Sequence, residues 1–255
     1  MIFYFSATGN SLFVAKELDS EAISISQIIH DEKLEFSDDS IGIVFPDYGS
    51  EAPYMVRDFL KKAKFHTDYL YMIMTYGCNN GASAKMMRTF CEEYGLHISY
   101  FHTIKMVDNY LPAFDMDKEK AMDKKITEQL EEIKKDIHNR KEYFEETSEE
   151  GQSVYDNYQS FTNVHPEISW KNIHFSATAS CIGCGICTKV CPVGCIQIVN
   201  GKALHREEGC QKCMACIHNC PENAIRMSIP EENENARFRN ENVTLQQLIA
   251  ANCQN

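Results

Sequence analysis

The sequence predicts an α/β fold with a doubly wound parallel sheet, followed by a small α+β domain rich in cysteine. Two observations lead to this prediction. Over residues 1–150, apolar runs of strand length alternate with segments whose apolar residues recur at helical spacing, which is typical of a parallel sheet. Over residues 176–230, eight of the twelve cysteines form two copies of one spacing. We expect a linker over 151–175 and a tail with a short helix over 231–255.

The sheet elements can be placed from the apolar pattern. The first strand, Met1–Ser6, ends abruptly in a turn and is followed by a helical pattern. Further strands are expected at Ala22–Ile29, Ile41–Phe45, Tyr69–Thr75 and Ile98–Met106, and helices at Tyr54–Ala63, Lys85–Tyr94 and Asp117–Tyr143. The segment His30–Ser40 is short for a helical crossover, and a loop there would leave one face of the sheet partly bare.

The turn after the first strand has the composition of an anion site. It reads Ala7-Thr8-Gly9-Asn10-Ser11 and leads from a strand into a helix. Backbone N–H groups at such a turn, together with hydroxyl groups, can hold a phosphate at the positive end of the helix. A capped strand-to-helix turn without a ligand explains the same residues.

The run SATGNS at this turn resembles the phosphate loop of flavodoxins, whose pattern is Ser or Thr, any residue, Thr, Gly, any residue, and then Thr or Ser. The resemblance implies FMN, with its phosphate held by Ser6, Thr8, Gly9, Asn10 and Ser11. In that fold the ligand binds at the carboxyl ends of the strands, where the strand order reverses.

Two later loops are expected to contact the flavin ring, through Pro46, Tyr48, Gly49, Thr75, Tyr76, Gly77 and Gly81. Tyr48 or Tyr76 can stack on the ring, and glycines allow backbone N–H groups to approach it. Ordinary packing at a strand end explains each tyrosine equally well. The segment Val107–Pro112 is a further candidate for closing the site. Cys78 is expected to be a passive loop residue, with a redox role as the alternative.

The two cysteine repeats both read C-x2-C-x2-C-x3-C-P and lie 29 residues apart; the first contains Cys181, Cys184, Cys187 and Cys191, and the second Cys210, Cys213, Cys216 and Cys220. In this spacing three cysteines of one repeat ligate a [4Fe-4S] cluster, and the fourth ligates the cluster of the other repeat. We therefore expect cluster one on Cys181, Cys184, Cys187 and Cys220, and cluster two on Cys210, Cys213, Cys216 and Cys191.

The repeats resemble the bacterial two-cluster ferredoxin over Ser176–Ile229. Zinc sites usually have paired ligands separated by a longer loop, and disulfide frameworks belong to small secreted domains, so neither explains three equally spaced thiols. Cys195 corresponds to Ala224 of the second repeat, and we expect a packed thiol there. A ligand exchange at Cys195 has no support from the spacing.

The linker and tail contain fewer signals. The segment Ser153–Ser176 is polar and is expected to be irregular, and Trp170, the only tryptophan, is expected to anchor the two domains to each other. A role for Trp170 in shielding the flavin or a cluster is the alternative. A helix is expected to start near Thr244, with Leu248 on its apolar face, and Cys253 is expected to be incidental.

Charge restricts the partners. The chain has 25 Lys and Arg against 37 Asp and Glu, a net charge of −12, which argues against nucleic acid and anionic membranes. No apolar run is long enough to cross a bilayer, and Met1–Phe5 lacks the basic region of a signal peptide. We expect a cytoplasmic protein with no membrane insertion that meets redox partner proteins, a ferredoxin or a flavoprotein.

The order of the two domains is similar to a family of fused flavodoxin–ferredoxin proteins of anaerobic bacteria. That resemblance implies electron transfer between two [4Fe-4S] clusters and FMN. Two alternatives stay open: an FMN-dependent reductase of a small molecule, which would be a ferredoxin- or flavin-linked oxidoreductase, and a redox sensor. Because no strand is followed by G-x-G-x-x-G, a protein electron donor is favoured over NADH.

Overall fold

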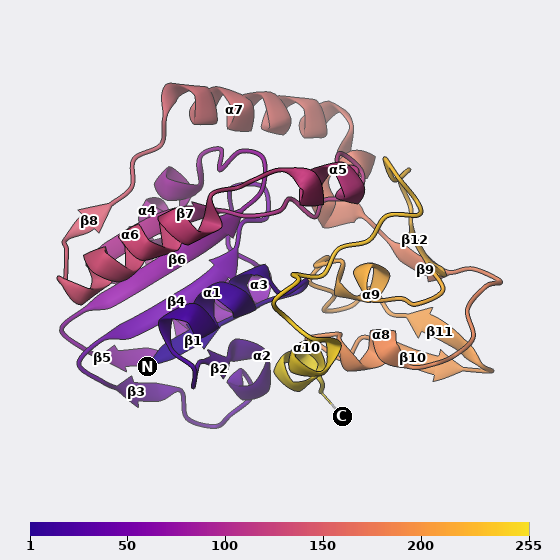
Figure 1. Cartoon of the computed structure of the whole chain (residues 1–255), viewed down its shortest axis with the longest axis horizontal. Coiled ribbons are helices and arrows are strands. Elements are labelled where there is room, and N and C mark those ends of the chain that lie inside the picture. The colour runs from indigo at the N-terminus through magenta and orange to yellow at the C-terminus, as the bar shows by residue number, and fades with distance from the viewer. Residues whose placement is uncertain (255) are drawn as a thin grey trace.

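The computed structural model describes residues 1–254 and has a six-stranded, all-parallel sheet at its centre (Figure 1). In spatial order the strands are β2 (Ile23–Ser24), β1 (Ile2–Tyr4), β4 (Ile41–Pro46), β6 (Leu70–Tyr76), β7 (Tyr100–Lys105) and β8 (Tyr143–Phe144). The first five follow the flavodoxin-like order, which reverses direction between β1 and β4. The predicted fold class is confirmed.

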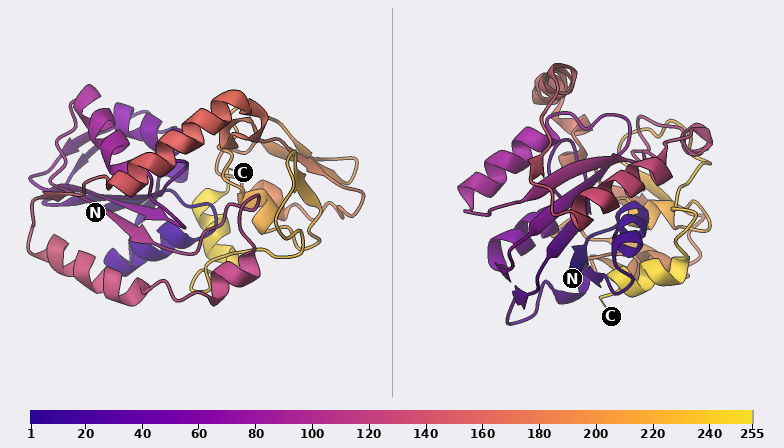
Figure 2. Two further views of the ribbon diagram at one scale, coloured as in Figure 1. Left: turned by 90° about the horizontal axis from the view of Figure 1, so that it is seen from above. Right: turned by 60° about the vertical axis from the view of Figure 1, so that its left-hand side comes forward.

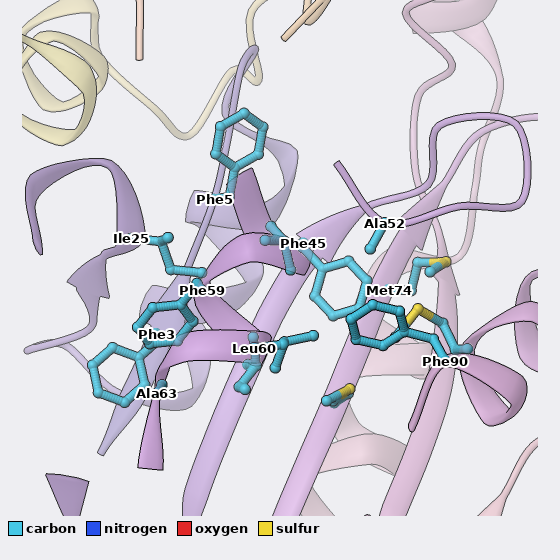
Figure 3. Close-up of a cluster of buried hydrophobic side chains, with 14 of the residues drawn as sticks. Phe3, Phe5, Ile25, Phe45, Ala52, Phe59, Leu60, Ala63, Met74 and Phe90 are labelled. Carbon is cyan, nitrogen blue, oxygen red and sulfur yellow. The ribbon is translucent and has the colours of Figure 1, made fainter. Parts of the chain in front are cut away.

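Helices cover both faces of the sheet, as a doubly wound fold requires. On one face lie α3 (Tyr54–Lys62) and α4 (Ser83–Glu93), and on the other α1 (Asn10–Leu18) and α6 (Ile126–His138). Figure 3 shows the α3 and α4 face, where Phe3 and Phe59 lie together and Phe90 packs near Met74. The Phe3 and Phe59 ring centroids are 5.2 Å apart.

One prediction near the β2 edge is wrong, and another is incomplete. The strand expected over Ala22–Ile29 ends at Ser24 and continues as α2 (Ile25–Ile28). The Ser24 hydroxyl and the Gln27 side chain both donate to the Ala251 carbonyl, so the chain turns here to meet the tail. The segment expected to be a loop contains β3 (Glu35–Ser37), which pairs in parallel with β5 (Lys64–His66).

The single long helix expected over Asp117–Tyr143 is also wrong. The chain forms α5 (Met116–Ala121), breaks, and resumes as α6. Lys125 has a φ of +53° at the break, and the Lys124 ammonium lies 2.7 Å from the Glu119 carboxylate in a buried ion pair. The pair needs the chain to fold back, which a continuous helix does not permit.

The segment expected to be irregular contains a regular helix, α7 (Glu149–Val164), followed by the short 3-10 turns η1 (Pro166–Ile168) and η2 (Trp170–Asn172). The Ser148 hydroxyl accepts a hydrogen bond from the Gly151 amide and caps α7. Figures 1 and 2 show α7 running along one side of the molecule, from the sheet towards the cysteine-rich unit.

The cysteine-rich unit consists of two similar halves with antiparallel strands (Figure 1). Its elements are β9 (Phe175–Ala177), α8 (Ile186–Lys189), β10 (Ile196–Val199), β11 (Lys202–His205), α9 (Ala215–His218) and β12 (Ile225–Met227). Strand β9 pairs with β12, and β10 pairs with β11. Helices α8 and α9 are 29 residues apart, so the structure preserves the offset of the sequence repeat.

The tail returns to the sheet and ends in α10 (Leu245–Asn252), which confirms the helix expected there. Thr244 and Gln247 form a capping box at its start, and Leu248 is buried against the core on the α1 face. Within residues 1–254 the structure has no helix with the length and apolar character that a membrane crossing requires.

Candidate functional site

A cavity of about 410 Å³ lies at the carboxyl ends of β1, β4, β6 and β7. This is the edge at which the strand order reverses, and the volume is in the range of small-molecule sites, roughly 300–1,000 Å³. Among the residues predicted to bind FMN, its walls include Ser6, Thr8, Asn10, Ser11, Pro46, Tyr48, Gly49, Thr75, Tyr76, Gly77 and Gly81.

Gly9 is the one predicted flavin-site residue outside these walls. Its φ is +102°, which favours glycine, and its amide donates to the Ser6 hydroxyl over 3.2 Å. An added Cβ would lie 3.0 Å from the Cβ of Asn240 in the tail. The positive φ of Gly9 therefore shapes the turn, and the absence of a side chain leaves room for the tail at Asn240.

The turn before α1 is held by neighbouring loops. The Asn109 side chain donates to the Thr8 hydroxyl over 2.7 Å, and the Asn10 side chain donates to the Val107 carbonyl over 3.0 Å. The hydroxyl groups of Ser11 and Thr75 are 2.9 Å apart. Because Asn10 and Ser11 line the cavity, the positive end of the nine-residue helix α1 faces it, which suits an anion.

Tyr48 and Trp170 form an aromatic wall. Their ring centroids are 5.6 Å apart with the rings nearly edge to face, and Trp170 also packs on Tyr54. The Tyr48 hydroxyl is buried without a hydrogen-bond partner, and burial raises its pKa well above the usual value. Trp170 thus contacts the sheet unit, as an interdomain anchor would, and lines the cavity as well.

Two partly buried carboxyl groups in the cavity wall, Asp47 and Asp108, were not among the residues predicted to bind FMN, although Asp108 lies in the candidate segment Val107–Pro112. Asp47 accepts hydrogen bonds from the Ser50 amide and the Ser83 hydroxyl, and burial raises its pKa to about 7. Asp108 accepts from the amides of Cys78 and Tyr110, and burial raises its pKa too. The available signal was an aspartate just after a strand: Asp47 directly follows β4 and Asp108 lies three residues after β7, in loops where such side chains satisfy turn amides.

The eight repeat cysteines gather into two groups. Cys181, Cys184, Cys187 and Cys220 surround one small cavity, and Cys191, Cys210, Cys213 and Cys216 surround another, which Cys195 also lines. Each group takes three thiols from one repeat and the fourth from the other, as the spacing predicts for [4Fe-4S] ligands. Four thiols around one cavity are a suitable donor set for such a cluster.

The second group lies next to the cavity of the sheet unit. Lys212, Cys213 and Met214 line that cavity, whereas no cysteine of the first group does within residues 1–254. Cys213 also packs against the hydrophobic cores on both faces of the sheet. The first group lies farther out: Cys184 is exposed, and so is 64% of its neighbour Ile182.

His218 joins three segments beneath the cavity. Its Nε2 donates to the Asn109 carbonyl over 2.8 Å, and its Nδ1 accepts from the Phe238 amide over 3.1 Å. Burial lowers the pKa of His218 to about 4, so the imidazole is neutral at pH 7. The sheet unit, the second repeat and the tail therefore meet at one uncharged side chain.

Comparison with known proteins agrees with the cysteine pattern. Residues 180–225 match the family of 4Fe-4S dicluster domains. A 57-residue stretch is 37% identical to a component of the ion-translocating oxidoreductase complex of Methanosarcina acetivorans, and it covers 22% of this chain and 22% of that protein. The chain therefore matches less than a quarter of the length of this curated relative.

A solved structure, the Trp repressor binding protein from Bacillus subtilis, overlaps 42% of this chain and 85% of that one. The two are 11% identical with a TM-score of 0.28, a likeness too weak to support a conclusion about function. The dicluster match and the grouped thiols together support a 4Fe-4S domain with an iron–sulfur electron-transfer role.

Proposed function

We propose that this chain is a fused flavodoxin–ferredoxin protein that relays electrons between two [4Fe-4S] clusters and FMN. The observation that carries the proposal is the position of Cys213, which belongs to the second cysteine group and lines the cavity of the sheet unit. Clusters exchange single electrons and flavins one or two, so their combination links one-electron partners to a two-electron store.

The proposed ligands follow from the two thiol groups and the cavity. Cluster one would be held by Cys181, Cys184, Cys187 and Cys220, and cluster two by Cys191, Cys210, Cys213 and Cys216. The phosphate of FMN would be held by the turn from Ser6 to Ser11 at the positive end of α1. Its ring would lie against the loops that contain Tyr48, Tyr76 and their neighbouring glycines.

The exposure of the thiols indicates the cluster at which partner proteins would bind. Electron transfer slows steeply with distance, so a partner must approach one cluster closely. Cluster one has an exposed thiol, Cys184, whereas the four thiols of cluster two are buried or partly buried, and this favours contact at cluster one. We propose that a ferredoxin or a flavoprotein exchanges electrons there, in the cytoplasm.

A second candidate function is supported by Asp47. Its pKa of about 7 means that its carboxyl group holds a proton in part of the molecules at neutral pH, inside the cavity wall. Such a group can supply a proton when a small molecule is reduced beside it. The second candidate function is therefore a reductase, in which the clusters supply electrons to the flavin and the flavin reduces a small molecule.

The test starts with anaerobic purification of the full chain. We expect about eight iron atoms per chain, from two four-iron clusters, and one bound FMN. Stopped-flow mixing with reduced ferredoxin should then show cluster and flavin reduction as separate optical signals. Zinc in place of iron contradicts the cluster assignment, and a chain that binds no FMN after gentle purification contradicts the flavin assignment.

A substitution tests the role of the second cluster. Cys213→Ser should abolish flavin reduction by ferredoxin, because it alters the cluster beside the cavity. Cys91→Ser is the matched control, since Cys91 is a buried thiol of α4 in the core of the sheet unit and belongs to neither thiol group. Flavin reduction in Cys213→Ser at the rate of Cys91→Ser would contradict the relay.

A further inference from the structure

The two cluster sites differ at a pair of side chains that the repeat would otherwise make equivalent. Cys195 lies four residues after Cys191, the last cysteine of the first repeat. At the offset of 29 residues its counterpart is Ala224, four residues after Cys220. One site therefore has a thiol where the other has a methyl group.

The strands that flank the two sites carry the second difference. In the β10–β11 hairpin, Ile196 is paired with His205. The residue equivalent to Ile196 is Ile225 of β12, and its partner on β9 is Ala177. An imidazole thus occupies, beside one cysteine group, the pairing position that alanine occupies beside the other.

His205 faces the sulfur atoms of Cys210, a member of the second group, and of Cys195. Its Nε2 lies 3.8 Å from the Sγ of Cys210 and 3.9 Å from the Sγ of Cys195, and its side chain is only 6% exposed. A ligating cysteine is a thiolate and can only accept, so Nε2 must carry the hydrogen. Nδ1 makes no hydrogen bond and lies 3.6 Å from a Glu207 carboxylate oxygen, so the ring can donate from Nε2 to the sulfur atoms.

Cys195 faces a different ligand of the same group. Its Sγ lies 3.5 Å from the Sγ of Cys191, and the residue is 4% exposed. When Cys191 ligates iron as a thiolate, the S–H group of Cys195 is the donor of this contact. Two sulfur atoms of the second group therefore each face a side-chain donor.

Backbone donors do not distinguish the two sites. Backbone amides point at three ligands of each group: Cys181, Cys187 and Cys220 of the first, and Cys191, Cys210 and Cys213 of the second. In the part of the chain that the structure describes, the side-chain donors to repeat cysteines are His205 and Cys195. The asymmetry is confined to these two residues.

We propose that Cys195 and His205 raise the reduction potential of cluster two by donating hydrogen bonds to its ligands, and that the ligands of cluster one receive no such bond from a side chain. Reduction adds negative charge to a cluster, and donors to its sulfur atoms stabilise that charge. Both residues act through the ligands Cys191 and Cys210 and are positioning residues. The proposal rests on the two-cluster part of the proposed function.

The experiment is an anaerobic redox titration of the loaded full chain, followed by electron paramagnetic resonance. Cys195→Ala and His205→Leu remove the donors, and Cys195→Ala copies the residue found at the other site. We expect the reduction equilibrium of one cluster to fall about tenfold in His205→Leu, which is about 59 mV for one electron. The other cluster should keep its potential, and the iron content should stay near eight atoms.

The gain-of-function control is Ala177→His, which places an imidazole at the equivalent pairing position beside cluster one. It should raise the potential of the cluster that the first two variants leave unchanged. Eight irons with unshifted potentials in Cys195→Ala and His205→Leu overturn this inference alone. Loss of iron in either variant overturns it too, because the residue would then be a ligand. A wild-type chain with fewer than two clusters contradicts the proposed function as well.

Discussion

His218 is a neutral imidazole with both ring nitrogens hydrogen-bonded, and this has a consequence for pH. Its pKa is lowered to about 4 in the folded chain, against about 6.5 in an unfolded one. Between these values only the unfolded chain takes up the proton. Stability is therefore complete above pH 6.5 and falls as the pH drops towards 4.

We predict that acidification to pH 5.5 costs the folded protein about 1 kcal/mol of stability through His218. Anaerobic thermal unfolding of the wild type and His218→Gln at pH 7.5 and 5.5 measures this. The variant should lose less stability between the two pH values. His30→Gln, at an exposed histidine, should behave as the wild type. Equal losses in the wild type and His218→Gln would refute the assignment.

For individual residues, the sequence was informative where the spacing of side chains allows only one kind of site. The doubled cysteine spacing predicted which thiols gather around which cavity. It could not place Cys195 and His205 beside the second group, because that depends on the register of β10 with β11. Asp47 was missed for a similar reason, since its burial arises from loops far apart in the chain.

The tail is the element on which the first turn depends. Asn252 at the end of α10 is fully buried, and its side chain donates to the Ser6 carbonyl over 2.9 Å. The Asn240 amide donates to the Thr8 carbonyl over 2.8 Å, and the Asn240 side chain donates to Asn10. Two asparagines of the tail thus satisfy backbone and side-chain groups of the turn before α1.

We predict that Asn252→Ala destabilises the protein by about 1–3 kcal/mol, because it leaves the Ser6 carbonyl buried without its donor. The loosened turn should also weaken FMN binding, measured by flavin fluorescence during titration of the apoflavin form. Gln246→Ala, at an exposed position of the same helix, should change neither quantity. Wild-type FMN affinity in Asn252→Ala would show that the tail does not support the turn.

The errors among the elements have physical causes. Helix α7 was missed because it buries only Gly151 and Thr162, so it has no apolar stripe to detect. Its cap at Ser148 and the glutamates that follow were the available signals. The break between α5 and α6 depends on the buried Lys124–Glu119 pair, which the apolar spacing of the segment did not reveal.

At the scale of the molecule, the sheet unit and the cysteine-rich unit share an aromatic and sulfur-rich junction. Trp170, the only tryptophan, lies there at 7% exposure against Tyr48 and Tyr54. Cys213 packs against the sheet cores nearby. Loss of iron from the second cysteine group should therefore change the surroundings of side chains in the sheet unit.

We predict that anaerobic removal of iron with a chelator changes the environment of Trp170 and weakens FMN binding. Metal binding is coupled to folding, and loss of the ions releases the segment that forms one wall of the cavity. Tryptophan emission should shift to longer wavelength as the ring gains solvent, and reconstitution with iron and sulfide should restore it. Full loss of iron with unchanged emission would contradict coupling between the units.

The return of the tail to the first turn also bears on the order of biosynthesis. A chain leaves the ribosome from its amino end, and early segments fold as they emerge. The turn from Ser6 to Asn10 is made first, yet its partners Asn240 and Asn252 follow both cysteine repeats. The first loop of the protein therefore reaches its final form only after all eight repeat cysteines have been synthesised.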